Sequence, residues 1–231
     1  MKKLIFLLWA TTAQATPPDS ISLYDRVIGY SDTQLFILRE TQDNLGLYIY
    51  GMHDVFLVAK SLETGMDEAI WPVYRVHSAS EATPKTRSFA LEGAVNPFAI
   101  MAAAPAQIES RDFQDPNLYR FDEPVNEITA LTIQDIAADP AALMAQIAQS
   151  ISFTSAAIQP YPEGDYANMS YTSPQDLLAS MVYTLQDCDI DGVDTLFRYP
   201  RPDIQLARIA CADDDDQQVW LAVVLPPKTE P

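Results

Sequence analysis

The sequence of 231 residues predicts an α+β fold, with an N-terminal antiparallel β-meander, a helical middle and a C-terminal three-stranded antiparallel segment. Strand-length apolar runs occupy the two ends of the chain, whereas helix signals are confined to the middle. Strands and helices are therefore grouped, which is typical of α+β proteins and not of a repeating parallel βαβ sheet. Apolar residues make up 48% of the chain, which is enough to bury a core.

Apolar runs near the N-terminus predict the strands of the meander. Short turn sequences, such as residues 31–33 and 51–54, separate these runs, so consecutive strands should pair as antiparallel hairpins. Because Pro72 has no N–H to donate, the strand that contains it is expected at an edge of the sheet. The expected strands are residues 26–30, 34–41, 45–50, 55–61 and 69–76.

A long irregular connection is expected over residues 77–125, which are rich in Ala, Pro and Ser. Within it, Asn96 before Pro97 predicts a short helix through Ala104, since Asn caps a helix and Pro fits its first position. Residues 132–135 have the pattern of a capping box and predict the start of the helical middle.

Two clearer helix starts follow in the sequence. Asp139 before Pro140 predicts a helix through Gln149. Residues 173–176, Ser-Pro-Gln-Asp, supply an N-cap, a first-position proline and an acidic third residue, and the helix that they open should end near Gln186.

The C-terminal part returns to β-structure. Apolar runs predict strands over residues 193–199, 204–211 and 217–225. The last run is apolar at both odd and even positions, so both faces of that strand should be covered and the strand should be central.

Residues 1–15 have the pattern of a cleavable signal peptide. Two lysines at positions 2 and 3 precede a short apolar stretch, and Ala13-Gln14-Ala15 is a typical cleavage site. The apolar stretch is far shorter than the ~20 residues that span a bilayer, so we expect no membrane insertion after cleavage. This pattern predicts a bacterial protein that is periplasmic or secreted.

Residues 16–231 are expected to form a single α+β domain with a strongly acidic surface. The chain carries 14 Lys and Arg against 32 Asp and Glu, a formal charge of −18. Nucleic acids and anionic lipids bind basic surfaces, so this charge excludes both as partners. The expected partner is either a cationic protein or a glycan.

The chain has two cysteines, Cys188 and Cys211. An even number of cysteines in an oxidising compartment predicts a disulfide bond between them. A redox pair is normally spaced C-x-x-C and a cysteine metal site needs more ligands, so both alternatives fit less well.

Alternate aspartates followed by a glycine follow the predicted second helix, as in a D-x-D-x-D-G calcium loop. The expected ligands are Asp187, Asp189, Asp191, the carbonyl of Val193, and Asp194. An EF-hand loop requires Glu at its twelfth position, where this chain has Arg198. A solvated acidic turn explains this segment better than a calcium site does. Calcium is nevertheless the one cofactor that the sequence suggests.

Tyr161, Tyr166 and Tyr171 lie in a segment rich in Pro and polar residues. Tyrosine offers rigid amphipathic contact area, so this segment could bind a glycan or a protein. Alternatively, the rings attach a long loop to the body of the domain. Residues 213–216 are four consecutive aspartates, which predict a strongly negative end of the molecule.

The sequence assigns no catalytic residues. It has two histidines, His53 and His77, and lacks the short motifs of serine hydrolases and zinc proteases. We therefore expect an exported binding or protein-interaction module rather than an enzyme. A hydrolase that uses a carboxylate pair and a calcium-stabilised structural protein are the alternatives.

Overall fold

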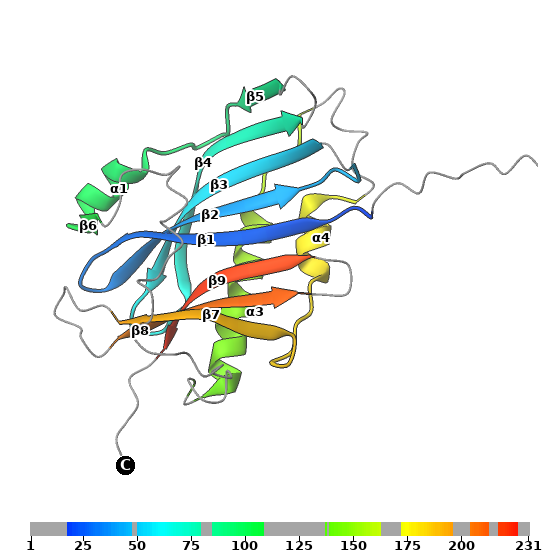
Figure 1. Ribbon diagram of the computed structural model, residues 1–231. Helices are drawn as coiled ribbons and strands as arrows, with labels where there is room; N and C mark the ends of the chain where they lie inside the picture. Colours follow the sequence, from blue (N-terminus) through cyan, green and yellow to red (C-terminus); the bar gives the residue numbers. More distant parts are fainter. Residues whose placement is uncertain are drawn as a thin grey trace, which may run out of the picture.

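The computed structural model describes residues 18–47, 50–79, 85–108, 137, 139–162, 172–195, 204–212 and 217–225. The strands are β1 (Ile21–Tyr30), β2 (Gln34–Asp43), β3 (Tyr50–Ser61), β4 (Asp67–Ala79), β5 (Lys85–Phe89), β6 (Gln107–Ile108), β7 (Cys188–Thr195), β8 (Gln205–Ala212) and β9 (Gln218–Leu225). The helices are α1 (Pro97–Ala103), α3 (Pro140–Ala157) and α4 (Pro174–Ser180). These elements form an α+β domain around one mixed sheet (Figure 1).

The sheet has the order β5-β4-β3-β2-β1-β9-β8-β7, and β6 adds a short pairing to β1. Strands β1 to β5 pair consecutively and antiparallel, as do β7 to β9. The two groups join where β1 runs parallel to β9, with Leu23 opposite Val219 and Tyr24 opposite Trp220. The N-terminal meander and the C-terminal segment are thus parts of one sheet, a union that the sequence did not predict.

The first strand pairings differ from the prediction around residues 45–54. Leu45 and Gly46 both have positive φ, 55° and 67°, and form the turn between β2 and β3. The expected strand over residues 45–50 was therefore wrong at Leu45 and Gly46, and the expected turn at residues 51–54 lies inside β3. This extension of β3 places Asp54 opposite β4, where its carboxylate pairs with Arg75.

Pro72 lies in a strand that is not at the end of the sheet order, because β5 follows β4. However, β5 pairs only with residues 75–79 of β4, so Pro72 lies beyond the end of that ladder. Its carbonyl accepts a hydrogen bond from the N–H of Val95 instead. The proline, which has no N–H to donate, therefore lies in a part of β4 that has no β5 partner.

Each helix of the described residues begins at a cap that the sequence predicted. The side chains of Asn96, Asp139 and Ser173 accept hydrogen bonds from backbone N–H groups of the first turns of α1, α3 and α4. The ends differ: α3 continues to Ala157, and α4 ends at Ser180 rather than near Gln186. The Ser180 hydroxyl donates to the carbonyl of Leu177, a local bond that competes with helix continuation.

The two faces of the sheet have separate cores. On the α3 face, Leu143, Ile147 and Ile151 of α3 pack with Ile37 and Val223 in the larger cluster. On the opposite face, the α1 face, Met101 packs with residues of β1, β2 and β3, among them Phe36 and Leu57. In Figure 1, α3 runs behind the sheet and crosses its strands.

A buried ion cluster lies at the centre of the α3 face. The Arg39 guanidinium is bidentate to Asp25, at 2.6 and 2.8 Å, and binds Asp67 at 2.6 Å. The same group donates to the Ser150 carbonyl and the Thr154 hydroxyl of α3. All three charged side chains have no exposed area. The guanidinium thus connects β1, β2 and β4 with α3.

Lys60 completes this cluster. Its ammonium pairs with Asp67 at 2.7 Å and donates to the Gly65 carbonyl and the Ser150 hydroxyl. Burial opposes ionisation of the Asp67 carboxyl, but the charges of Arg39 and Lys60 outweigh it and lower the pKa of Asp67. Burial in turn lowers the pKa of Lys60, although the charge of Asp67 opposes this shift. A charge buried in this way is tolerated only while it keeps its partner.

Replacement of Arg39 by Met should lower the free energy of unfolding by about 3–5 kcal/mol, because Asp25 is left buried without a cation. The matched control is Arg87→Met at an exposed position of β5, with an expected change within about 0.5 kcal/mol. Urea unfolding monitored by circular dichroism measures both values. Equal losses in the two variants would contradict a central role for the cluster.

Candidate functional site

A row of side chains crosses the α1 face from β8 to β4, and we call it the cross-sheet row. Residues alternate between faces along a strand, so Glu40 lies on the face opposite Arg39. Tyr24 is the direct ladder partner of both Trp220 and Glu40. The row consists of Arg208, Trp220, Tyr24, Glu40, His53 and Ser78.

The first half of the row is an aromatic stack. The rings of Tyr24 and Trp220 have centroids 6.1 Å apart and planes inclined by 51°. The Arg208 guanidinium lies 4.8 Å from the centre of the Trp220 ring, in the geometry of a cation–π contact. Both aromatic residues are partly exposed, whereas Arg208 is 8% exposed. The tryptophan is thus held in one orientation while part of its surface reaches solvent.

The second half of the row is a chain of hydrogen bonds over three adjacent strands. Nδ1 of His53 lies 2.8 Å from a carboxylate oxygen of Glu40, and Nε2 lies 3.0 Å from the hydroxyl oxygen of Ser78. The Gln42 amide donates to the same oxygen of Glu40 at 3.1 Å. Carboxylate, imidazole and hydroxyl are therefore linked in the order that serine nucleophiles use.

Electrostatics keep the Glu40 carboxyl ionised. Burial alone would raise its pKa, but the hydrogen bond from His53 and, when the imidazole is protonated, its charge oppose burial, and the net effect lowers the pKa of Glu40. The Gln42 amide and the charge of Arg26 act in the same direction. The side chains of His53 and Glu40 are 23% and 26% exposed, so the chain of hydrogen bonds is within reach of solvent.

On the α3 face, a second polar cluster attaches the segment after α3 to the sheet. Arg75 forms an ion pair with Asp54 and donates to the carbonyls of Gln159 and Pro160. The Tyr161 ring lies 4.9 Å from the Arg75 guanidinium, and its hydroxyl donates to Asp43 at 2.5 Å. Tyr161 therefore attaches the chain to the domain, the alternative to a binding role for its segment.

Burial disfavours the ionised form of the two carboxyl groups in this cluster. Burial raises the pKa of Asp43 to about 6, although hydrogen bonds from Tyr161 and Leu45 lower it in part. Burial likewise raises the pKa of Asp54 despite its ion pair with Arg75. Both aspartates are 1% exposed, so they contribute to stability and its pH dependence rather than to an open site.

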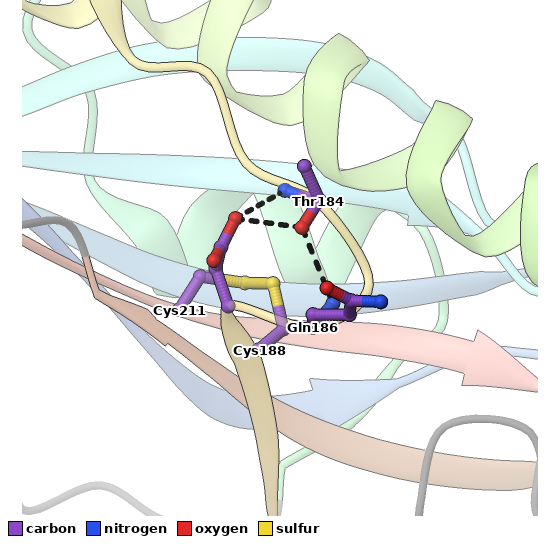
Figure 2. The surroundings of a disulfide bond; sticks show 5 residues. Thr184, Gln186, Cys188 and Cys211 are labelled. Atoms are coloured by element: carbon purple, nitrogen blue, oxygen red, sulfur yellow. Dashed lines mark hydrogen bonds between the residues drawn. A yellow bond between two sulfur atoms is a disulfide. The ribbon is translucent and has the colours of Figure 1, made fainter.

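The predicted disulfide between Cys188 and Cys211 is confirmed. The two residues are direct partners in the antiparallel ladder of β7 and β8, with Cα atoms 4.0 Å apart. This spacing is slightly shorter than the usual range for a disulfide. Figure 2 shows the disulfide beside Thr184 and Gln186, two residues of the turn that precedes β7.

The aspartate-rich segment differs from the loop that the sequence predicted, because β7 already begins at Cys188. Asp187 caps the preceding turn by accepting hydrogen bonds from the N–H and the hydroxyl of Thr184. The described residues contain no group of three or more His, Cys, Asp or Glu side chains that could hold a metal ion. The side chains of Asp191 and Asp194 lie outside the description, so the calcium site stays a prediction.

Several other predicted features also lie outside the described residues. They are the signal peptide at 1–15, the capping box at 132–135, Tyr166, Tyr171 and the aspartates at 213–216. Within the described part of the chain, no helix is long and apolar enough to cross a membrane.

Sequence reasoning missed the cross-sheet row. Alternation in β2 could have placed Glu40 and Gln42 opposite Arg39, but the turn expected at residues 51–54 removed His53 from the sheet. With that strand correctly extended, Glu40 and His53 would have been expected on the same face.

No protein-family model, no curated protein and no solved structure matches this chain. The cross-sheet row is therefore interpreted from its own geometry.

The contribution of Asp43 to the free energy of unfolding should fall as the pH rises from about 4 to 6. Its pKa is about 6 in the folded protein and 3.8 in the reference state, so the folded state binds the proton more tightly. Asp43→Asn removes the charge. Its amide oxygen can accept the Leu45 N–H, and its NH₂ group can donate to the Tyr161 hydroxyl, so the variant should stabilise the fold at pH 8 by up to about 3 kcal/mol. Urea midpoints at pH 4 and pH 8 measure this difference.

Tyr161→Phe is the matched variant, which keeps the Asp43 carboxyl group and should raise its pKa further. Loss of the hydroxyl removes a hydrogen bond that lowers the pKa of Asp43, so the pH-dependent range should move upward. If Asp43→Asn and wild type have the same dependence between pH 4 and pH 8, the assignment to Asp43 is wrong.

Replacement of both cysteines by Ala should lower the free energy of unfolding by roughly 3.5 kcal/mol, from the chain entropy of the closed loop. The sequence separation of 23 residues sets the size of that loop. Dithiothreitol should reproduce the loss in wild type and leave the double variant unchanged, as urea midpoints would reveal. Fully reduced wild type with unaltered stability would contradict this prediction.

Proposed function

We propose that this protein is an exported, acidic protein-interaction module, and that the aromatic half of the cross-sheet row is the centre of its contact surface. The observation that carries this proposal is the Arg208–Trp220–Tyr24 stack. Trp, Tyr and Arg are the residue types enriched among the few that dominate binding energy at protein interfaces.

The stack is also pre-organised for binding. Arg208 supports one side of the Trp220 ring, and Tyr24 lies against it from the neighbouring strand. Side chains that are already held in one rotamer lose little entropy when a partner docks. Partly exposed aromatic surface on a rigid sheet therefore favours binding of a folded partner.

Net charge determines which partners approach quickly. The chain carries −18, so its long-range field attracts cations and repels other acidic proteins. We infer a protein partner with net positive charge, whose association rate falls with ionic strength. A glycan carries no such charge requirement and is the alternative that the experiment distinguishes.

The burial of the carboxylates with raised pKa favours a binding module over a carboxylate-pair hydrolase. Asp43 and Asp54 are such carboxylates, but each is 1% exposed and held by Tyr161 or Arg75. A general acid needs access to its substrate. Neither side chain is placed to contact one.

A photo-crosslinking residue, p-benzoylphenylalanine, at Ser22 tests the proposal in the organism that produces this chain. Ser22 lies on the same face of β1 as Tyr24, and Val182, 82% exposed and outside the row, is the control position. The expected result is a cationic protein, identified by mass spectrometry, that crosslinks at position 22 and not at position 182. Trp220→Ala should abolish this adduct.

Salt provides the second readout. The association rate of the identified partner should fall between ~50 and ~500 mM salt, where the Debye length shortens from about 14 to 4 Å. Equal adducts at positions 22 and 182, or an adduct at position 22 that survives Trp220→Ala, would overturn the proposal. A glycan adduct, or the absence of any adduct at position 22, would also overturn it.

A further inference from the structure

We propose that Ser78 is a nucleophile that accepts acyl groups from activated esters, with His53 as its general base and Glu40 orienting the imidazole. This activity goes beyond the proposed interaction role and does not depend on it. The two hydrogen bonds that define it are 2.8 Å, between Glu40 and Nδ1 of His53, and 3.0 Å, between Nε2 and the Ser78 hydroxyl. Both lie within the reach that nucleophile and base require.

The proton positions follow from the partners. The ionised carboxylate of Glu40 has no proton to donate, so the neutral imidazole of His53 carries its proton on Nδ1 and donates it there. Nε2 is then the basic nitrogen and accepts from the Ser78 hydroxyl.

Gly51 provides independent support, because its missing side chain makes room for the imidazole. Gly51 is the direct ladder partner of Ser78. A Cβ atom at position 51 would lie 3.1 Å from Nε2 of His53, which is tighter than ordinary packing. The glycine therefore lets the imidazole cross β3 and reach the hydroxyl on β4.

The reaction balances with groups already present. The Ser78 oxygen attacks the acyl carbonyl carbon, and its proton moves to Nε2 of His53. The ester C–O bond then breaks, and the departing alkoxide or phenoxide takes the proton from the imidazolium. The acyl group remains on Ser78, and Glu40 stabilises the imidazolium while it exists.

The position of Ser78 within the sheet limits the substrate class. Ser78 pairs with Gly51 of β3 on one side and Thr86 of β5 on the other, so its backbone belongs to the ladder. Strong activation of poor leaving groups relies on free backbone donors that stabilise the oxyanion. Base catalysis alone accounts for roughly 10²–10⁴-fold, which favours esters with good leaving groups.

The test uses the full chain with p-nitrophenyl acetate, followed by intact-mass and peptide mass spectrometry. Wild type should gain one acetyl group, located on Ser78, with release of nitrophenolate. His53→Gln should slow the reaction at least ~10²-fold. Acidification should also slow it, because a protonated imidazole cannot accept the hydroxyl proton.

The matched serine is Ser88, which is exposed on β5 and is the ladder partner of Val76 in β4. Ser88→Ala should react like wild type, and Ser78→Ala should lose the acetylated peptide. Gly51→Ala and Glu40→Gln should slow acetylation while thermal melting verifies that each variant is folded. Acetylation at Ser78 that is as slow as at Ser88, insensitive to His53→Gln, or undetectable overturns the proposal.

Discussion

The buried guanidinium of Arg39 is the interaction on which the rest of the fold depends. It connects Asp25 of β1 and Asp67 of β4 with the helix α3, and Asp25 also accepts the N–H of Ala222 in β9. The ion pair of Arg39 and Asp25 therefore contacts strands from both ends of the chain. A charge without its partner in this interior would cost several kcal/mol, so any arrangement that separates these elements is strongly disfavoured.

Buried ion pairs on the α3 face also determine what the α1 face presents. Arg39 and Asp54 keep their partners only in one strand register, and a slip by one residue would turn every side chain to the other face. Their sequence neighbours are Glu40 and His53, which the same register places on the opposite face. The structural charges on one side thus position the hydrogen-bonded groups on the other.

The proposed interaction surface and the proposed nucleophile share the cross-sheet row but have different requirements. The aromatic stack lies where β1 and β9 run parallel, and it needs only a fixed orientation of Trp220 and Tyr24. The Glu40–His53–Ser78 half needs distances of 2.8–3.0 Å between particular atoms. The antiparallel ladder makes these residues diagonal neighbours on one face, because His53 is directly opposite Gln42 and Val76. Long side chains such as imidazole and carboxylate can bridge that diagonal spacing.

The sequence by itself determined the features whose cause is local. The capping residues before Pro97, Pro140 and Pro174 mark helix starts within a few residues, and two cysteines in a chain with a signal-peptide pattern leave one pairing. Only the tertiary structure decided the parallel pairing of β1 with β9 and the extension of β3 through His53. Partners distant in the chain stabilise both features, whereas residues 51–54 alone resemble a turn. The cross-sheet row depends on these long-range pairings, so local patterns could not reveal it.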